Sequence, residues 1–172
     1  YSPAICDIVV MVEDTSFMYV TGPDVVETVT GEKLSHTDLG GADVHRSKSG
    51  VAHLVGENDQ RAMDLAVKAL SYLPNNHEET PETRDERLPE PSESLRELVP
   101  EDKSRPYEVK KVIKAIIDGS SFMEIQPDFA RHLVTGFGRL GGHSVGIVAN
   151  QPKYNAGTLD IKASYKGARF VR

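Results

Sequence analysis

The stretch Leu133-Val-Thr-Gly-Phe-Gly-Arg-Leu-Gly-Gly-His-Ser-Val-Gly-Ile-Val-Ala149 decides the fold of this chain. Its two apolar ends predict strands over Leu133–Phe137 and Val145–Ala149, with Gly141-Gly142 between them. A Gly-Gly pair between two strands favours a two-residue turn, because both glycines can adopt a positive φ. The sequence therefore predicts a β-hairpin at this point.

The same stretch contains a second pattern that points to a different fold. Gly136-Phe-Gly138-Arg-Leu-Gly141 matches the G-x-G-x-x-G pattern of dinucleotide-binding proteins, and Asp160 follows about twenty residues later, as that pattern requires. In such proteins a helix begins at the glycines, and its N-terminus binds the pyrophosphate. Because a strand is predicted after these glycines, the hairpin is the favoured interpretation.

Helices are predicted on both sides of this hairpin. Asn58 is a suitable N-cap for a helix with apolar residues at helical spacing, which Pro74 ends. A second helix is expected to have Pro106 in its first turn and Gly119 as its C-terminal cap. A third is expected over residues 160–172, with small residues on its packing face.

Two more strands are predicted near the start of the chain, at Ile8–Val12 and Phe17–Val20. The run Ile8–Val12 is continuously apolar, like Val145–Ala149, which is typical of strands covered on both faces. Alternation of such strands with helices predicts an α/β fold. Cys6 lies in an apolar setting, and we expect it to be a buried, unreactive thiol.

Composition excludes several classes of function. The net charge of −6 disfavours nucleic acid as a partner, and the absence of Trp disfavours a stacking platform for single strands. One cysteine cannot form an internal disulfide, which fits a reducing compartment. The sequence shows neither an apolar stretch of membrane-spanning length nor a leader pattern. It begins with Tyr1, so we expect it to be processed, trimmed or a fragment.

Residues 75–105 differ from the rest of the chain. This stretch has ten acidic and five basic residues, so it carries five of the six net negative charges, and it includes four prolines. Periodic apolar residues are almost absent, so little surface could be buried to offset the entropy of ordering. We expect a solvated, acidic and Pro-rich linker, with an acidic docking segment as the alternative.

His45 and His53 invite a metal-site interpretation. A zinc site usually needs three or four ligands at suitable spacing, and no third ligand accompanies these two histidines. We therefore expect no metal to be bound by this chain.

Several separated blocks, in the right order, resemble one protein family. They are Gly22–Val26, Asp38–His45, Ser49–His53, Gly146–Pro152 and Gly167–Arg172. Together they resemble the carboxyltransferase (beta) subunit of biotin-dependent acyl-CoA carboxylases, of the propionyl-CoA and acetyl-CoA carboxylase type. The resemblance runs through nearly the whole chain, is weakest at residues 75–105, and covers the middle of such a subunit.

The resemblance implies a crotonase-like (ClpP/crotonase) α/β fold in two partial domains. Residues 1–74 would be the C-terminal part of the N-terminal carboxyltransferase domain. Residues 75–105 would be the linker, and residues 106–172 would be the start of the C-terminal carboxyltransferase domain.

The resemblance also implies an activity. Such subunits move a carboxyl group from carboxybiotin to the α-carbon of an acyl-CoA, and the blocks favour propionyl-CoA, which would give methylmalonyl-CoA. The family's two oxyanion holes, a Gly-Gly pair and a Gly-Ala pair, would flank this chain, so we expect the isolated chain to be inactive. Alternatives are a methylmalonyl-CoA or glutaconyl-CoA decarboxylase or transcarboxylase subunit, a non-catalytic assembly module and, least favoured, a crotonase-type hydratase.

We expect no catalytic side chain here, only residues that support substrate binding. The candidates are Tyr1, Gly40, Gly41, Ala42, His45, Gly50, His53, Asn150 and Gln151. The implied cofactor is biotin, carried on a partner protein or subunit, and the implied substrate is an acyl-CoA. Implied partners are a biotin carboxylase, a biotin carboxyl carrier subunit and further copies of the chain in a hexameric ring. The implied location is the bacterial or archaeal cytoplasm, or the mitochondrial matrix.

Overall fold

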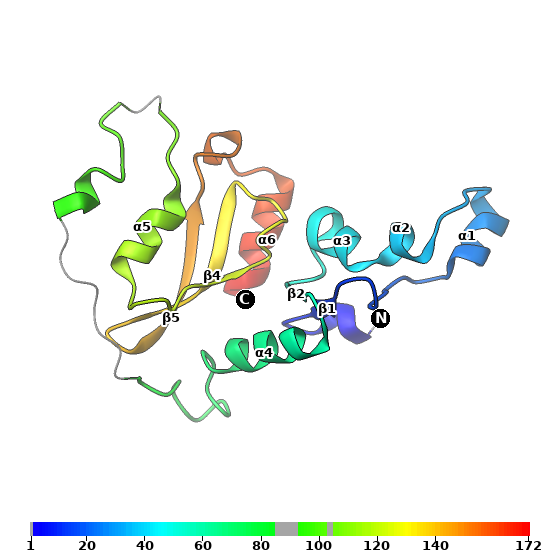
Figure 1. The fold of residues 1–172 in the computed structure, drawn as a ribbon, viewed down its shortest axis with the longest axis horizontal. Helices are drawn as coiled ribbons and strands as arrows, with labels where there is room; N and C mark the ends of the chain where they lie inside the picture. Colours follow the sequence, from blue (N-terminus) through cyan, green and yellow to red (C-terminus); the bar gives the residue numbers. More distant parts are fainter. Residues whose placement is uncertain (1, 85–92, 103–104) are drawn as a thin grey trace. The chain divides into compact units, whose positions relative to one another are not determined.

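The computed structural model describes residues 2–84, 93–102 and 105–172. The chain divides into two compact units, Tyr1–Val67 and Lys68–Arg172, and the division falls within helix α4 (Asp59–Leu70). Figure 1 shows the elements of each unit along the chain. The domain limits expected from the sequence, at residues 74 and 106, stay a prediction.

The first unit contains a parallel pair of short strands. Strand β1 (Val10–Val12) pairs with β2 (Leu54–Gly56), so that Val10 lies opposite Leu54. Parallel strands require a long crossover connection, and here it contains only short helical elements. In chain order these are α1 (Pro23–Thr30), α2 (His36–Gly40), α3 (Ala42–Val44) and a π-helical turn (His45–Ser49); a 3₁₀ turn (Ser2–Ile5) precedes β1.

Two predictions for the first unit are wrong. Phe17–Val20 forms no strand, since Phe17 makes only an isolated bridge with Gly41 and the Met18 N–H donates to the Gly40 carbonyl at 2.8 Å. The apolar pattern misled because this segment packs along a helix end instead of pairing with a strand. Cys6 is exposed and not buried, because the 3₁₀ turn before it leaves its Sγ at the surface, 3.4 Å from the Ser2 carbonyl oxygen. The strand predicted at Ile8–Val12 is confirmed in shorter form by β1.

The second unit is built on a three-stranded antiparallel sheet. Its order is β3 (Met123–Ile125), β4 (Leu133–Leu140) and β5 (His143–Asn150). The predicted hairpin is confirmed: Gly141 and Gly142 join β4 to β5 with φ values of 60° and 81°. The buried Asp118 carboxylate fixes this turn, because it accepts hydrogen bonds from both glycine N–H groups at 2.9 and 2.6 Å.

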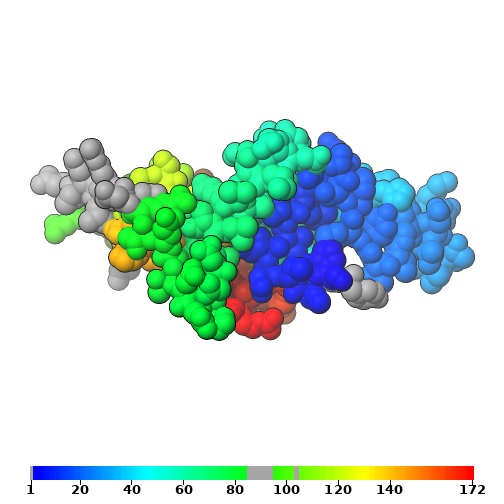
Figure 2. Space-filling model, turned by 90° about the horizontal axis from the view of Figure 1, so that it is seen from below, coloured from blue at the N-terminus to red at the C-terminus, as the bar shows by residue number. Residues whose placement is uncertain are grey.

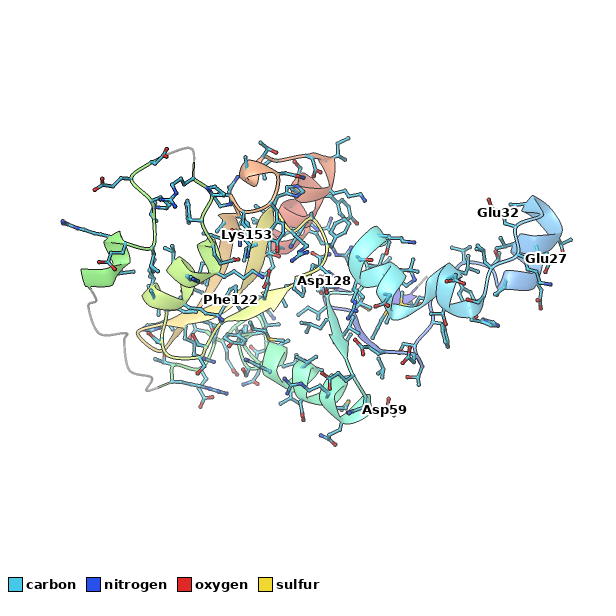
Figure 3. The ribbon with its side chains drawn as sticks, turned by 45° about the horizontal axis from the view of Figure 1, so that its top comes forward. Glu27, Glu32, Asp59, Phe122, Asp128 and Lys153 are labelled. Atoms are coloured by element: carbon cyan, nitrogen blue, oxygen red, sulfur yellow. The ribbon has the colours of Figure 1, made fainter. Side chains whose placement is uncertain are left out.

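Helices cover both faces of this sheet (Figure 1). Helix α5 (Val109–Ile116) packs against Val134 on the central strand through Val109 and Ile113, and Phe122, labelled in Figure 3, packs against the same cluster. Helix α6 (Ile161–Val171) packs on the opposite face, where the Phe170 ring lies 5.1 Å from that of Phe137. Strand β4 is thus almost entirely buried, whereas β5, at the edge, is more exposed than its apolar sequence predicts.

Helices α4 and α6 begin where the sequence predicts, each at a side chain that caps it, whereas α4 ends at Leu70, earlier than the predicted stop at Pro74. The Arg61 N–H donates to Asn58 Oδ1 at 2.9 Å at the start of α4, and the Ala163 N–H donates to Asp160 Oδ1 at 2.8 Å at the start of α6. The hydrogen bond from Ala163, with a second one from His132, lowers the pKa of the Asp160 carboxyl. The predicted cap at Asn58 is confirmed, and Asp160 supplies a cap to the helix that was expected from residue 160.

The predicted limits of the middle helix are wrong. Helix α5 begins at Val109, after Pro106, because the buried Gln151 side chain accepts the Val109 N–H at 3.1 Å and supplies the cap. It ends at Ile116, before Gly119, because Ile117 is extended and buries its side chain in the cluster beneath the helix. Short 3₁₀ turns at Glu93–Arg96 and Asn155–Gly157 complete the described elements.

A buried lysine on α6 organises the loop between β3 and β4. The Lys166 side chain is fully buried, and its ammonium group donates to the carbonyls of Gln126, Phe129 and Leu133 at 2.8, 2.8 and 2.7 Å. Burial lowers the pKa of Lys166 to about 8, so the group is still protonated at pH 7. Each of its three protons then has a carbonyl acceptor.

We expect Lys166→Met to destabilise the protein by about 2–4 kcal/mol, because it leaves three buried carbonyls without a donor. Urea unfolding of the complete gene product that contains this sequence would measure the loss. Lys162→Met, on the exposed side of the same helix, is the control. Equal stability of the two variants would contradict the structural role of Lys166.

The same lysine predicts a pH dependence. Its pKa is about 8 in the folded chain and about 10.5 when unfolded, so between these values the unfolded state binds more protons. The contribution of this group to the free energy of unfolding should therefore rise with pH over that range. Urea unfolding at pH 8 and pH 10 would show a larger rise for the wild type than for Lys166→Met, and identical changes would refute the assignment.

Candidate functional site

The predicted site segment in the first unit is held by unusually close backbone contacts. A Cβ atom on Gly40 would lie 2.1 Å from the carbonyl oxygen of Met18, and one on Gly41 would lie 2.7 Å from that of Thr37. Neither distance is possible for a real side chain. Both glycines are therefore required by the packing of the chain on itself.

His45 ties the same segment to Met18. Its Nε2 lies 2.6 Å from the Met18 carbonyl oxygen, and its Nδ1 lies 2.9 Å from Ser49 Oγ. Because a carbonyl oxygen can only accept, Nε2 carries a proton and donates it. Gly50 ends the π-helical turn in the left-handed conformation, with φ of 71°. These residues hold the segment's shape with bonds inside the unit.

His53 has a similar role at the sheet. Its side chain is only 3% exposed, and its ring Nδ1 accepts a hydrogen bond from the Val9 N–H at 2.9 Å. The backbone N–H of His53 donates to the Val9 carbonyl, also at 2.9 Å. Accepting at Nδ1 requires the neutral imidazole with its proton on Nε2. His53 thus fastens the beginning of β2 to the chain that enters β1.

A small cavity of about 110 Å³ adjoins Gly41 and Ala42. Charged residues surround it, and Arg46 bridges two of them, with Nη1 3.0 Å from Glu13 Oε1 and Nη2 2.8 Å from Asp43 Oδ1. Asp14, which has a positive φ of 58°, adds a third carboxylate to the lining. The lining carries more negative than positive charge, so this cavity is unsuited to a phosphate group.

The other predicted residues lie in the second unit. Gln151 is fully buried: its Oε1 accepts the Val109 N–H at 3.1 Å, and its Nε2 donates to the Glu108 carboxylate. Burial raises the pKa of Glu108, but hydrogen bonds from Gln151 and Lys153 lower it overall. Figure 3 shows Lys153 near α5, where its Nζ lies 3.4 Å from Glu108 Oε2. Asn150 donates to the Gly157 carbonyl.

The structure therefore brings the candidates together in two groups. The first group follows the chain from the end of α2 to the residue before β2, and in the second group Asn150 ends β5 and Gln151 follows it. The members of the first group are Gly40, Gly41, Ala42, His45, Gly50 and His53. Tyr1 lies outside the described residues. The polar side chains in both groups are hydrogen-bonded within their own unit, so they shape the backbone. A part in substrate binding stays a prediction for all nine.

Two buried cations were not predicted from the sequence. Arg139 is 1% exposed, and Lys166 is fully buried. The available signal was a lone basic residue inside an apolar strand, and another among the small residues of α6. Within residues 2–84, 93–102 and 105–172, no group of three or more His, Cys, Asp or Glu side chains could hold a metal ion. In the same ranges no helix is long and apolar enough to cross a membrane.

Comparison with known proteins places this geometry in a class. The chain superimposes with a TM-score of 0.96 on a transcarboxylase 12S hexamer with hydrolysed methylmalonyl-coenzyme A bound, at 43% identity, over 99% of this chain and 34% of that one. It also superimposes on a single-chain, multi-domain long-chain acyl-CoA carboxylase, with a TM-score of 0.81 at 28% identity, over 98% of this chain and 16% of that one. The fold is that of a partial crotonase-like α/β carboxyltransferase domain, as the sequence predicted.

The sequence comparisons give the family. The model of the carboxyl transferase domain matches residues 1–172, and the chain belongs to this family. It is 52% identical to a propionyl-CoA carboxylase carboxyltransferase subunit of Haloferax mediterranei and 47% identical to the methylmalonyl-CoA decarboxylase subunit alpha of Veillonella parvula. Each match covers all of this chain and 34% of the relative, so the chain spans about a third of their length. The predicted family is confirmed.

We expect Gly40→Ala to destabilise the first unit by about 2–4 kcal/mol, because its Cβ would overlap the Met18 carbonyl oxygen. Urea unfolding and amide hydrogen exchange of the complete gene product would measure the effect. Gly22→Ala is the matched control: its Cβ would meet nothing closer than 3.9 Å, so about 1 kcal/mol or less is expected. Equal losses in the two variants would show that the close contact at Gly40 is unimportant.

Proposed function

We propose that this chain forms part of a carboxyltransferase that moves a carboxyl group from carboxybiotin to the α-carbon of an acyl-CoA. Propionyl-CoA is the proposed acceptor, and methylmalonyl-CoA is the product. The observation that carries this proposal is the match of the carboxyl transferase model to all 172 residues, together with 52% identity to a propionyl-CoA carboxylase subunit.

The chemistry of carboxyl transfer explains why such a chain needs no general acid or base of its own. Transfer generates two anions, the ureido oxygen of biotin and the enolate of the thioester. Rigid backbone N–H groups can stabilise both without reorganising during the reaction. A scaffold whose glycines are fixed by close packing, as at Gly40 and Gly41, suits a mechanism that depends on backbone position.

Within the described residues, the candidate side chains make their hydrogen bonds inside the chain, and none of these contacts identifies a pocket for biotin or coenzyme A. The glycines of the site segment face carbonyl oxygens of their own unit, and the histidines and Gln151 are hydrogen-bonded within theirs. In the proposal these residues, with Tyr1, Ala42, Gly50 and Asn150, position the backbone that borders the substrate.

The proposed partners follow from the relatives. Two relatives in Mycobacterium tuberculosis are described as biotin-dependent acetyl-/propionyl-coenzyme A carboxylase subunits, and the transcarboxylase 12S core is described as a hexamer. We propose that biotin reaches this chain on a separate carrier, that a biotin carboxylase loads it, and that the complete protein forms a hexameric ring. We propose no metal for this site. The proposed location of the complete protein is the cytoplasm.

A second candidate is the same half-reaction run in the other direction. The methylmalonyl-CoA decarboxylase subunit of Veillonella parvula is 47% identical over the whole chain, only a few per cent below the carboxylase relative. A decarboxylase or transcarboxylase would share the fold and both anionic intermediates. The partners and the direction of the reaction separate these candidates.

The proposal predicts ATP-dependent fixation of labelled bicarbonate into propionyl-CoA. The complete gene product would be mixed with a biotin carboxylase and biotinylated carrier, and acetyl-, propionyl- and butyryl-CoA would be compared as acceptors. The highest incorporation is expected with propionyl-CoA. Omitting the carrier is the control and should abolish incorporation.

Other outcomes would decide between the candidates. Biotin-dependent release of CO₂ from methylmalonyl-CoA or glutaconyl-CoA, without fixation, would establish the decarboxylase. Absence of both reactions in a correctly folded oligomer would favour the assembly module.

A further inference from the structure

A basic pocket of about 430 Å³ lies in the second unit. It is formed where the chain leaves α4, at the hairpin end of β4 and at the turn after α5. Figure 2 shows the green segment that follows α4 at the molecular surface. Its lining includes three cations and three serines: Lys68, Arg84 and Arg139, with Ser71, Ser120 and Ser121. Such a concentration of positive charge is unexpected in a chain with a net charge of −6.

Among the described residues, no carboxylate pairs with the positive charges of this pocket. Lys68 and Arg84 are exposed, and their side chains form no ion pair within the described part of the chain. The buried Arg139 donates its hydrogen bonds to carbonyls. Asp118 lies close to Ser120 and Ser121 in sequence. Its carboxylate, however, accepts hydrogen bonds from the N–H groups of the two hairpin glycines. An anion in the pocket would relieve the repulsion among its cations.

Two of the three serine hydroxyl groups, those of Ser120 and Ser121, can supply directional donors, whereas the proton of Ser71 is already used. Ser121 Oγ accepts the Arg139 N–H at 3.0 Å, so its own proton is available to a ligand. Ser120 is exposed and follows Gly119, where no neighbouring atom lies within 4 Å of the position that a Cβ would take. Ser71 donates to the Lys68 carbonyl at 2.7 Å.

The base of the pocket is rigid. Tyr72 donates a hydrogen bond to the Ser121 carbonyl, and the Arg139 guanidinium lies over the Tyr72 ring, 5.3 Å from its centre. The Ser71 and Gly142 carbonyls hold the same guanidinium at 2.6 and 3.0 Å. One buried, hydrogen-bonded cation and two exposed cations are a suitable arrangement for an anion with several oxygens.

We propose that this pocket binds a phosphate group, either as inorganic phosphate or as the phosphomonoester of a small molecule. A tetrahedral phosphate presents oxygens in several directions, which matches cations and hydroxyls arriving from α4, from the segment after it and from the turn before β3. A carboxylate is planar and would meet only part of this set. The inference does not depend on the carboxyltransferase reaction, and its test measures binding directly.

The test is titration calorimetry of the complete gene product with inorganic phosphate and, separately, with adenosine monophosphate as a phosphomonoester. The pocket variant is Lys68→Gln with Arg84→Gln. The matched control is Arg61→Gln with Lys111→Gln, which also removes two exposed cations and includes one on the same helix α4, but leaves the pocket intact. Both double variants should unfold at nearly the wild-type temperature.

We expect the pocket variant to bind phosphate at least tenfold more weakly than the wild type, and the control to differ less than twofold. Tenfold tighter binding of adenosine monophosphate than of phosphate would identify a phosphomonoester as the ligand, and equal or weaker binding would identify the free ion. No binding of either probe at 10 mM, or equal loss of binding in both double variants, would overturn the proposal.

Discussion

The second unit depends on one guanidinium group, that of Arg139, whose hydrogen bonds go to main-chain carbonyls and not to a carboxylate. Arg139 points inward from the central strand and donates to the main-chain carbonyls of Ser71, Glu82 and Gly142. These carbonyls come from three separate parts of the chain, so a single side chain fixes the segment after α4 against the hairpin. A lysine would not replace it, because an ammonium group donates from a single nitrogen, whereas the guanidinium reaches these carbonyls from two nitrogens held in one plane.

The second buried cation acts in the same way on the loop between β3 and β4. Two residues of this loop, Gln126 and Ala130, have positive φ values of 53° and 43°, which are costly for residues with a side chain. The Lys166 ammonium gathers the Gln126, Phe129 and Leu133 carbonyls at one point and thereby holds the loop in this conformation. Both cations therefore hold the chain in place through main-chain carbonyls, and their burial is no evidence that they take part in catalysis.

How much of the fold could be predicted depended on how local its causes were. The hairpin at Gly141 was predictable because neighbouring glycines determine it, and the helices after Asn58 and Asp160 were predictable because each carries its own cap. The limits of α5 were not, since its cap is the side chain of Gln151, 42 residues away. The strand expected at residues 17–20 failed because its backbone partner is the end of α2.

In the candidate site, too, contacts between residues far apart in the sequence could not be predicted. Its residues were predicted from blocks of sequence that resemble the carboxyltransferase family, and the family is confirmed. The hydrogen bonds of those residues were unpredictable, because His45 reaches Met18 across 27 positions and His53 reaches Val9 across 44. The basic pocket was missed for the same reason, since its cations come from residues 68, 84 and 139.

These contacts bear on how such a chain could contribute to carboxyl transfer. If His45 or His53 were a general acid or base, a ring nitrogen would have to be available to the substrate, yet both nitrogens of His45 are bonded and His53 is buried. Gly40 instead brings two backbone segments closer than any other residue would allow. A reaction that relies on backbone N–H groups needs this kind of fixed geometry, because an error of about 1 Å in the position of a donor can cost about a hundredfold in rate. The proposed contribution of the site segment is therefore positional, and its sensitivity to substitution should follow packing distance more closely than side-chain chemistry.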